Sequence, residues 1–306
     1  MSGYIPFTDE QRARANSVDL EEFLSSQGER LIPSGREKRL GSDHSVTVRG
    51  SSWYDHAAEH GGGPVEFVER FYRKSYPEAV TILLGGAAGI PYPVAKPREE
   101  RPRKPFELPK PNGNMRRVFA YLLKERNISK DVVQYFAKAR QLYEEADHHN
   151  CVFVGMDEKG VARHAHMRST RSGGDVFRLN IESSNPCYSF HHRGGDNTLF
   201  VFEAPIDMLS FMTMYPDNWK QHNYVACCGT SSLPVFQMLN DKKNRPSSVY
   251  LCLDNDEAGH KASQRMAEQL KPWSVDVERL VSIKKDWNED LKETNQEVVP
   301  LCQIMC

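Results

Sequence analysis

The stretch Val249-Tyr250-Leu251-Cys252-Leu253-Asp254-Asn255-Asp256-Glu257-Ala258-Gly259 starts as an apolar run and stops abruptly at two aspartates. A short run of β-branched and apolar residues followed by small residues predicts a buried strand whose carboxyl end leads into a helix. Asp254 and Asp256 are separated by one residue, so on an extended backbone they point the same way and can share a hard cation such as Mg²⁺. The same pattern fits a helix N-cap, with Asp256 capping a helix that starts near Ala258.

A second apolar run ends in the same manner earlier in the chain. Thr198-Leu199-Phe200-Val201-Phe202 is followed by Glu203 and then by Pro205 and Asp207, and proline at that position is typical of the first turn of a helix. Further segments alternate, with strands expected over 198–202, 224–228, 249–253 and 275–281 and helices over 206–214, 232–239 and 260–270. This alternation predicts an α/β fold with a parallel sheet covered by helices on both faces, and ligands gather at such strand ends.

The order and spacing of these elements resemble the Toprim domain, which bacterial primases, topoisomerases and some nucleases share. The turn Gly229-Thr230 is similar to one in the primase branch of that family. The resemblance implies that Glu203 is a general acid or base and that Asp254 and Asp256 hold Mg²⁺ or Mn²⁺. Crowded by other acids, Glu203 is expected to have a raised pKa when no metal is bound. Asp207, one helical turn further on, is expected to ligate the metal or to hold Glu203 in place.

Downstream, Lys285-Asp286-Trp287-Asn288 resembles the Asp-x-Asp pair that completes the acidic cluster of primases. Asn288 stands where the second aspartate usually stands. The resemblance implies that Asp286 and Asn288 help to place a second ion, although the amide makes that ligand set incomplete. Lys285 is assigned to nucleotide contact.

Residues 1–90 predict a small α+β domain. Residues 8–30 favour a helix, residues 30–56 favour a small antiparallel sheet, and two more helices follow. This order resembles the N-terminal zinc ribbon of bacterial primases, which binds zinc through three cysteines and a histidine. No cysteine precedes Cys151, so we expect a degenerate ribbon without zinc. Arg36, Arg39 and Trp53 are candidates for binding single-stranded nucleic acid through charge and stacking, although simple solvation of the surface explains the same charges.

Residues 91–113 are expected to form an extended, semi-rigid linker, because prolines at high density exclude helix and central strand. Seven prolines and six basic residues lie between Pro91 and Pro111. Residues 114–197 predict a pair of helices followed by a hairpin, which resembles the segment before the Toprim core in primases and in related proteins of plasmids, phages and other mobile elements. Arg168 matches a primase arginine near the incoming nucleotide, and Arg178 is a second candidate. A solvated hairpin edge is the alternative for both.

Composition limits the remaining possibilities. The formal net charge is −1, so attraction to nucleic acid must come from local basic surfaces. Seven cysteines, an odd number, all at or after Cys151, do not suggest a disulfide framework, and we expect a reduced, cytoplasmic setting. No apolar run is long enough for a membrane span, and the first residues do not resemble a secretion signal.

The sequence thus predicts four parts: 1–90, 91–113, 114–197 and a Toprim domain over 198–306. The function that the resemblance implies is a primase-like nucleotidyltransferase that makes short RNA primers from ribonucleotides on single-stranded DNA, with a helicase or another replication protein as a possible partner. A nuclease with the same acidic cluster is one alternative. A non-catalytic nucleic-acid- or replisome-binding protein is another, which the missing zinc ligands and Asn288 favour.

Overall fold

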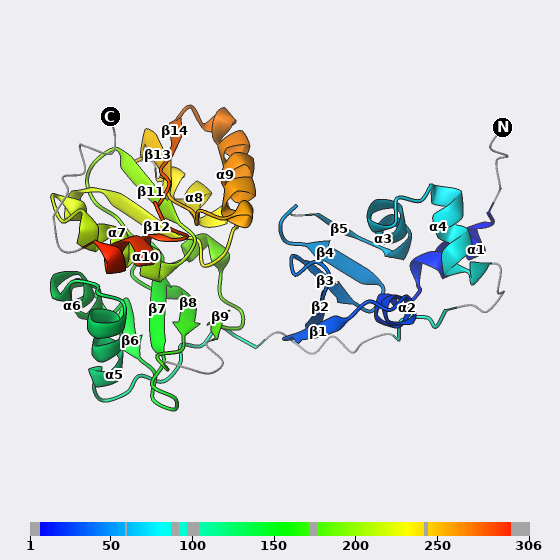
Figure 1. Ribbon diagram of the computed structural model, residues 1–306, viewed down its shortest axis with the longest axis horizontal. Coiled ribbons are helices and arrows are strands. Elements are labelled where there is room, and N and C mark those ends of the chain that lie inside the picture. The colour runs from blue at the N-terminus through cyan, green and yellow to red at the C-terminus, as the bar shows by residue number, and fades with distance from the viewer. Residues whose placement is uncertain are drawn as a thin grey trace. The chain divides into compact units, whose positions relative to one another are not determined.

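The computed structural model of this chain describes residues 7–58, 60–86, 92–96, 104–171, 177–241 and 244–294. The chain divides into two compact units, Met1–Arg101 and Pro102–Cys306. The division falls within the proline-rich stretch 91–113. Figure 1 shows the helices and strands of each unit.

Two short helices, rather than one, open the first unit. They are α1 (Asp9–Asn16) and α2 (Leu20–Ser26). The expectation of one helix over 8–30 is wrong because Asp19 starts a new helix: its Oδ1 accepts the backbone N–H groups of Glu21 at 2.9 Å and Glu22 at 3.3 Å.

A five-stranded antiparallel sheet follows, as the sequence predicts for this region. Its strands pair in chain order and are β1 (Leu31–Ser34), β2 (Glu37–Leu40), β3 (Val46–Arg49), β4 (Ser52–Asp55) and β5 (His60–Gly62). The helices α3 (Pro64–Phe71) and α4 (Tyr76–Leu83) come next. Phe23, Val48, Trp53 and Phe67 are buried in one core, so this unit is held by apolar packing among its own elements.

Residues near the two ends of the proline-rich stretch make hydrogen bonds, those near its start with the first unit and those near its end with the second. Val94 bridges Val18 in the first unit, and Asp19 N–H donates to the carbonyl of Pro93 at 2.9 Å. In the second unit the Tyr143 hydroxyl donates to the carbonyl of Pro109 at 2.6 Å. Residues 91 and 97–103 of the expected linker lie outside the described residues.

The second unit begins with the helices and hairpin that the sequence predicts. The helices are α5 (Arg116–Ala120), a π-helix (Tyr121–Glu125) and α6 (Lys130–Lys138). A four-stranded antiparallel sheet follows in chain order, with β6 (Leu142–Glu144), β7 (Cys151–Met156), β8 (Ala162–Arg168) and β9 (Arg178–Asn180). The π-helix was not predicted. Such turns are rare and frequently occur at functional sites.

The last sheet of the second unit is mostly parallel and has the order β10-β12-β11-β13-β14. Its strands are β10 (His191–His192), β11 (Thr198–Phe202), β12 (Asn223–Ala226), β13 (Ser248–Leu251) and β14 (Asp276–Arg279). Only β10, at one edge, pairs antiparallel. The helices between and after the strands are α7 (Pro205–Met214), α8 (Leu233–Leu239), α9 (Glu257–Leu270) and α10 (Trp287–Glu293). Single 3₁₀ turns occur at Pro186–Tyr188, Trp219–Gln221 and Lys271–Trp273.

The two faces of this parallel sheet bury different partners. Phe200 and Phe202 of β11 point into a core with α7 and α10, whereas Leu199 and Val201 point into a core with α8 and α9. The first of these cores also contains residues of α6 and β7, among them Phe136. The predicted parts 114–197 and 198–306 therefore share one hydrophobic core.

Candidate active site

Glu203 and Asp254 leave the same end of two neighbouring parallel strands. Strands β11 and β13 pair Val201 with Leu251, and Cys252 N–H donates to the carbonyl of Val201 at 2.7 Å. Glu203 comes directly after β11, and Asp254 comes three residues after β13. The carboxyl ends of parallel strands meet at one edge of a sheet, so the two acids are brought to the same edge.

Asp256 and Asp286 both cap helices at this edge. The Oδ1 of Asp256 accepts the N–H of Gly259 at 2.9 Å, so the N-cap interpretation of the sequence is confirmed for that oxygen. Its Oδ2 lies 4.0 Å from the ammonium nitrogen of Lys285. The Oδ1 of Asp286 caps α10 by accepting the N–H of Glu289 at 2.8 Å. Capping thus occupies one oxygen of Asp256 and leaves Oδ2 for another partner.

Hydrogen bonds connect the segment with Lys285 and Asp286 to the residues that follow β13, where Asp254 lies. Asn255 N–H donates to the carbonyl of Lys285 at 2.7 Å. The indole Nε1–H of Trp287, which is 3% exposed, donates to the carbonyl of Cys252 at 2.9 Å. The loop that supplies Asp286 therefore has a fixed position beside β13.

The environment of Asp254 does not support the charge of its carboxylate. Its Oδ1 is buried and has no hydrogen-bond partner within the described part of the chain. Burial, and then the negative charges of Glu203, Asp286 and Asp256, raise the pKa of Asp254 to about 7. Such a carboxylate is stabilised by a cation that meets its unpaired oxygen.

The neighbouring acids are shifted in the same direction. Burial raises the pKa of Glu203, the charges of Asp256 and Asp286 add to that effect, and Arg178 and Lys285 oppose it. The pKa of Asp207 is raised well above its usual range, first by burial and then by the charges of Asp286 and Asp254. The raised pKa that the sequence predicts for Glu203 is therefore supported, and the acids affect one another as members of one cluster.

The donor set of this cluster fits Mg²⁺. Asp254 and Asp256 offer hard carboxylate oxygens, and one of them is an unpaired buried atom. No three His, Cys, Asp or Glu side chains among the described residues are grouped as a complete metal site. Mg²⁺ commonly binds through one or two carboxylates and retains several waters, which substrate phosphate replaces. Two carboxylates are therefore compatible with such an ion.

Asn288 does not belong to this donor set. It is 2% exposed, and its side-chain Oδ1 accepts from Arg126 Nη1 at 3.0 Å. Its Nδ2 donates to the carbonyl of Arg126 at 2.8 Å and to Ser210 Oγ at 2.9 Å, and its backbone N–H donates to Asp207 Oδ1 at 3.2 Å. These bonds occupy both polar atoms of the amide. We therefore correct the expected role of Asn288 from metal ligand to a buried residue that joins Arg126, Ser210 and Asp207 by hydrogen bonds.

The predicted basic residues of the second unit surround the acids. Arg178 Nη1 lies 3.9 Å from Glu203 Oε1, and Lys285 approaches Asp256. Arg168 is the cross-strand partner of Arg178 on β8 and β9, and its charge lowers the pKa of Asp207 against the larger effect of burial. All three predicted cations are therefore placed near the carboxylates.

The candidates in the first unit have different surroundings. Arg36 and Arg39 are exposed, and Arg39 Nη1 donates to the carbonyl of His44 at 3.2 Å. Trp53 is 3% exposed, and its indole Nε1–H donates to the carbonyl of Gly63 at 3.0 Å. A buried ring cannot stack on a base, so the expected stacking role of Trp53 is corrected to a core role. Tyr54, next to it, is 41% exposed.

Sequence reasoning missed Tyr121 and Arg126. The Tyr121 hydroxyl accepts from Arg168 Nε at 2.8 Å and from Arg126 Nε at 2.9 Å. Both residues precede Asn288 by more than 160 positions, and no local pattern relates them to it. Their connection to the acidic cluster appears only in three dimensions.

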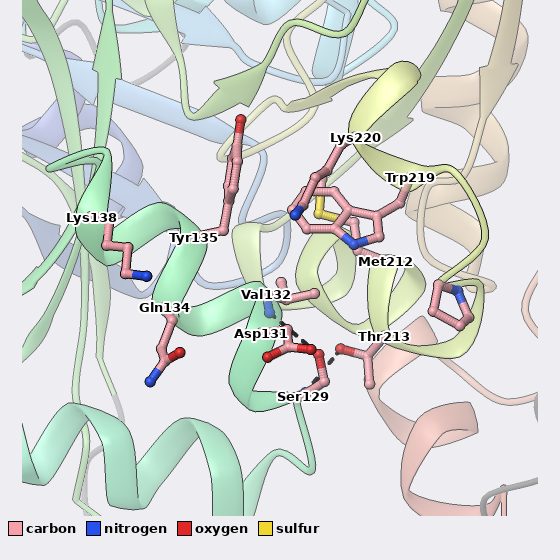
Figure 2. A pocket seen from close by; sticks show the side chains of 11 residues that line it. Ser129, Asp131, Val132, Gln134, Tyr135, Lys138, Met212, Thr213, Trp219 and Lys220 are labelled. Carbon is pink, nitrogen blue, oxygen red and sulfur yellow. Dashed lines mark hydrogen bonds between the residues drawn. The ribbon is translucent and has the colours of Figure 1, made fainter.

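A separate hollow of about 400 Å³ lies between α6 and the last turn of α7. Figure 2 shows Tyr135, Lys138, Trp219 and Lys220 around it. Asp207 lies in the first turn of α7 and Thr213, which lines the hollow, lies in the last. The hollow is thus at the opposite end of this helix from the acidic cluster and is not part of it.

Comparison with protein families identifies two adjacent regions. Residues 200–291 match the family described as Toprim-like, and residues 120–202 match a protein family of unknown function, DUF3991. The first match covers β12, β13, β14, most of β11 and every acid of the cluster. No helix among the described residues is long and apolar enough to cross a membrane.

Two relatives extend along nearly the whole chain. The uncharacterized protein pXO2-78 of Bacillus anthracis is 22% identical over 320 residues, which cover 95% of this chain and 91% of the relative. A 65 kDa protein of Zymomonas mobilis subsp. mobilis is 22% identical over 313 residues, which cover 91% of this chain and 51% of the relative. The chain thus spans about half the length of that second relative.

Solved structures with a similar fold include two primases. The primase fragment of the bacteriophage T7 primase-helicase protein has 18% identity and a TM-score of 0.49, covering 86% of this chain and 94% of that one. The Aquifex aeolicus primase, in its zinc-binding and RNA polymerase domains, has 16% identity and a TM-score of 0.38, covering 94% of this chain and 83% of that one.

Proposed function

We propose, from the premise that residues 200–291 form a Toprim-like domain, that this protein is a primase-like nucleotidyltransferase that joins ribonucleotides on single-stranded DNA. The observation that carries the proposal is the unpaired, buried Oδ1 of Asp254 at the same sheet edge as Glu203. An acid with this environment favours a bound cation, and an acid beside it with a raised pKa is suited to move a proton.

In this proposal Asp254 and Asp256 hold one divalent ion, Mg²⁺ or Mn²⁺, and Asp286 adds negative charge beside them. When bound, the ion neutralises charge on the substrate phosphate. The residues of the chain do the rest. The hydrogen bond that Gly259 N–H donates to Oδ1 fixes the Asp256 carboxylate, and the one that Asn255 N–H donates to the carbonyl of Lys285 fixes the loop with Asp286.

Glu203 is the proposed proton carrier. It accepts the proton of the attacking ribose hydroxyl while the new phosphodiester bond forms and pyrophosphate leaves. Its raised pKa makes proton exchange near neutral pH easier than for an ordinary carboxylate. Arg178, 3.9 Å from Glu203, and Lys285 are placed to contact substrate phosphates.

The test combines Mg²⁺ or Mn²⁺, four ribonucleotides and single-stranded DNA with the wild-type protein and with Asp254→Asn. Asp217→Asn, at an exposed position, is the matched control. Labelled short RNA from the wild type and the control, but not from Asp254→Asn, supports the proposal. Metal-dependent degradation of the DNA supports a nuclease instead. Salt-dependent DNA retention without either product supports a binding protein, which has a helicase or another replication protein as its expected partner.

A further inference from the structure

Asn255 lies between the two aspartates of the proposed metal site, and its N–H and both polar atoms of its amide have partners. Its backbone N–H donates to the carbonyl of Lys285 at 2.7 Å, and its Nδ2 donates to the carbonyl of Ser282 at 3.0 Å. Its Oδ1 contacts His260 Nε2 at 3.0 Å. The partners come from two segments, the loop before α10 and the first turn of α9. They therefore fix Asn255, and with it the short loop that carries both aspartates.

The partners of His260 determine the direction of this hydrogen-bond chain. An arginine has only N–H donors, so the contact between Arg279 Nη1 and His260 Nδ1 requires that Nδ1 accept. The proton of the imidazole is then on Nε2, which donates to Asn255 Oδ1. The chain thus runs from Arg279 through His260 and Asn255 to the carbonyl of Ser282. Each side chain in it has one orientation that satisfies its neighbours.

Arg279 contacts the backbone of Asp254 and not its carboxylate. Its Nη2 donates to the carbonyl of Asp254 at 3.3 Å, and within the described part of the chain it forms no ion pair. Burial lowers the pKa of Arg279, and the negative charge of Asp256 opposes that effect. The guanidinium therefore supports the loop from its backbone side, and the carboxylate oxygens of Asp254 are left for an ion.

The first turn of α9 lies directly against the same loop. The N–H of His260 donates to the carbonyl of Asp256 at 2.9 Å. A Cβ atom on Gly259 would lie 2.1 Å from the carbonyl oxygen of Asp254, which is far closer than any side chain permits. Glycine at this position thus allows the helix to approach the loop. The approach brings the imidazole within reach of Asn255.

The loop that Asn255 contacts is itself fixed. The two carboxylate oxygens of Asp290, a buried residue of α10, accept the N–H groups of Ile283 at 2.8 Å and Lys284 at 2.7 Å. Asp286 follows directly in this loop. Asn255 therefore joins the loop that carries Asp286 to the loop that carries the two proposed metal ligands.

We propose that Arg279, His260 and Asn255 are positioning residues that hold Asp254 and Asp256 at the spacing that a divalent ion requires. This inference rests on the proposed function, because the ion held by the two aspartates is part of that function. The acids repel one another when no ion is bound. A loop without these hydrogen bonds would relax away from the binding geometry, and restoring that geometry would cost affinity.

The test measures the affinity of the full chain for Mn²⁺ by electron paramagnetic resonance, without nucleotide or DNA. The variants are Asn255→Ala, His260→Ala and Arg279→Met, and the matched controls, at exposed positions, are Asn240→Ala, His44→Ala and Arg140→Met. Each of the three variants should bind Mn²⁺ about 10- to 100-fold more weakly, the usual loss when a residue that orients metal ligands is removed. The controls should bind as the wild type does, and Asp254→Asn should lose the site.

Conservative variants distinguish positioning from a general loss of packing. His260→Gln should recover part of the affinity that His260→Ala loses, because an amide can both accept from Arg279 and donate to Asn255. Arg279→Lys should recover little, since one ammonium lacks the planar fork that reaches the imidazole and the Asp254 carbonyl together. Full recovery in Arg279→Lys would contradict the role assigned to the fork.

A double variant tests whether the residues act through one network. Asn255→Ala already removes the acceptor of His260, so adding His260→Ala should weaken Mn²⁺ binding little beyond the larger single effect. Losses that multiply in the double variant would mean that the two side chains act independently, and the proposed chain would be wrong.

Thermal melting in EDTA checks the folding of each variant, and His260→Ala, at an exposed position, decides the matter if the other two do not fold. Unchanged Mn²⁺ affinity in folded variants overturns the positioning role, even if they melt at a lower temperature. If the variants bind Mn²⁺ weakly and the wild type makes no RNA, the positioning role stands and the proposed function fails. If the wild type makes RNA and the variants bind Mn²⁺ normally, the proposed function stands alone. A wild type without a Mn²⁺ site that depends on Asp254 contradicts both.

Discussion

Asp55 in the first unit and Asp254 in the second both lie at or just after the carboxyl end of a strand, and the protein treats the two acids in opposite ways. The Oδ1 of Asp55 accepts the N–H groups of Ala57 at 2.9 Å and Ala58 at 3.1 Å, and its Oδ2 pairs with Arg70 Nη2 at 3.1 Å. Burial alone would raise the pKa of Asp55, but these partners together lower it. Asp254 has a buried oxygen without a partner in the described residues, and its pKa is raised.

The difference separates an acid whose charge the fold satisfies from an acid whose charge it leaves unsatisfied. Asp55 keeps its charge because the fold supplies donors. The negative charges of Glu203 and other carboxylates act on Asp254, so its charge is costly unless a cation binds there, as we propose. Neutralising each acid should therefore have opposite effects on the stability of the ion-free protein.

The largest effect is expected for Asp254→Asn. Loss of a residue that only contacts a metal ligand typically lowers metal affinity or activity by roughly 10- to 100-fold. Loss of the ligand itself should lower RNA synthesis by more than that. In EDTA and above pH 7, where the wild-type Asp254 is ionised, the same variant should melt at a higher temperature than the wild type, because one repelling charge is gone. Mg²⁺ should raise the melting temperature of the wild type only. A variant that is less stable than the wild type in EDTA would contradict the contrast with Asp55.

The pH dependence of stability should differ between the two units. The folded-state pKa of Asp254, about 7, lies above the ordinary value of 3.8, so the folded chain holds a proton that the unfolded chain releases. Its contribution to stability is thus present at low pH and is lost as the pH rises towards 7, with a slope of up to about 1.4 kcal/mol per pH unit for one proton. Asp55, with a lowered pKa, contributes above its ordinary value and loses that contribution as the pH falls.

Hydrogen exchange in EDTA at pH 5 and pH 7.5 checks this expectation, because it reports the two units separately. Amides of β11 and β13 should be better protected at pH 5, after correction for the intrinsic exchange rate. Amides of β3 and β4 should change little. Equal changes in both sheets would remove the distinction between the two acids.

Asp55→Asn is expected to destabilise the first unit by about 1 to 3 kcal/mol, because the N–H groups of Ala57 and Ala58 lose their charged acceptor and Arg70 loses its partner. Chemical denaturation, with hydrogen exchange of the first unit as the readout, measures the change in the free energy of unfolding. Mn²⁺ binding and RNA synthesis on short templates should respond far less than they do to Asp254→Asn. A loss of Mn²⁺ binding in Asp55→Asn would be unexpected for a purely structural acid.

The smallest effect concerns Trp53→Phe. The substitution removes the hydrogen bond from the indole Nε1–H to Gly63 and should cost about 1 kcal/mol, the typical net value of such a bond. Affinity for single-stranded DNA should not change, because the ring is buried. Tyr54→Ala, at the exposed neighbouring position, is the comparison variant. A fall in DNA affinity in Trp53→Phe alone would restore the stacking role that we corrected.

The acidic strand ends could be predicted from the sequence because the signal is local. An apolar run with an acid directly after it gives both the strand and the position of the carboxylate, as at Glu203 and Asp254. The inward position of Trp53 follows from the strand alternation of the structure, in which Ser52 and Tyr54 are exposed while Trp53 and Asp55 are buried. The residue types alone do not predict which face is buried, because each face carries one aromatic ring and the buried face also carries an acid.

The periodicity of apolar residues does not reveal two other features. The role of Asn288 depends on Arg126, and the two meet only because α10 and the π-helix pack into the same unit. The break between α1 and α2 depends on Asp19, whose capping competes with continuation of the helix. In both cases a hydrogen-bond partner decides the outcome, and periodicity of apolar residues does not report that partner.

The single core that joins α6, β7 and the parallel sheet has a practical consequence for dissecting the protein. A fragment beginning at residue 198 would expose the side of the sheet that Phe136 and its neighbours cover, and would also lack Tyr121, Arg126 and Arg168. Truncation at that boundary should yield an aggregating polypeptide rather than a minimal enzyme. A fragment made for expression should therefore contain all of residues 104–294.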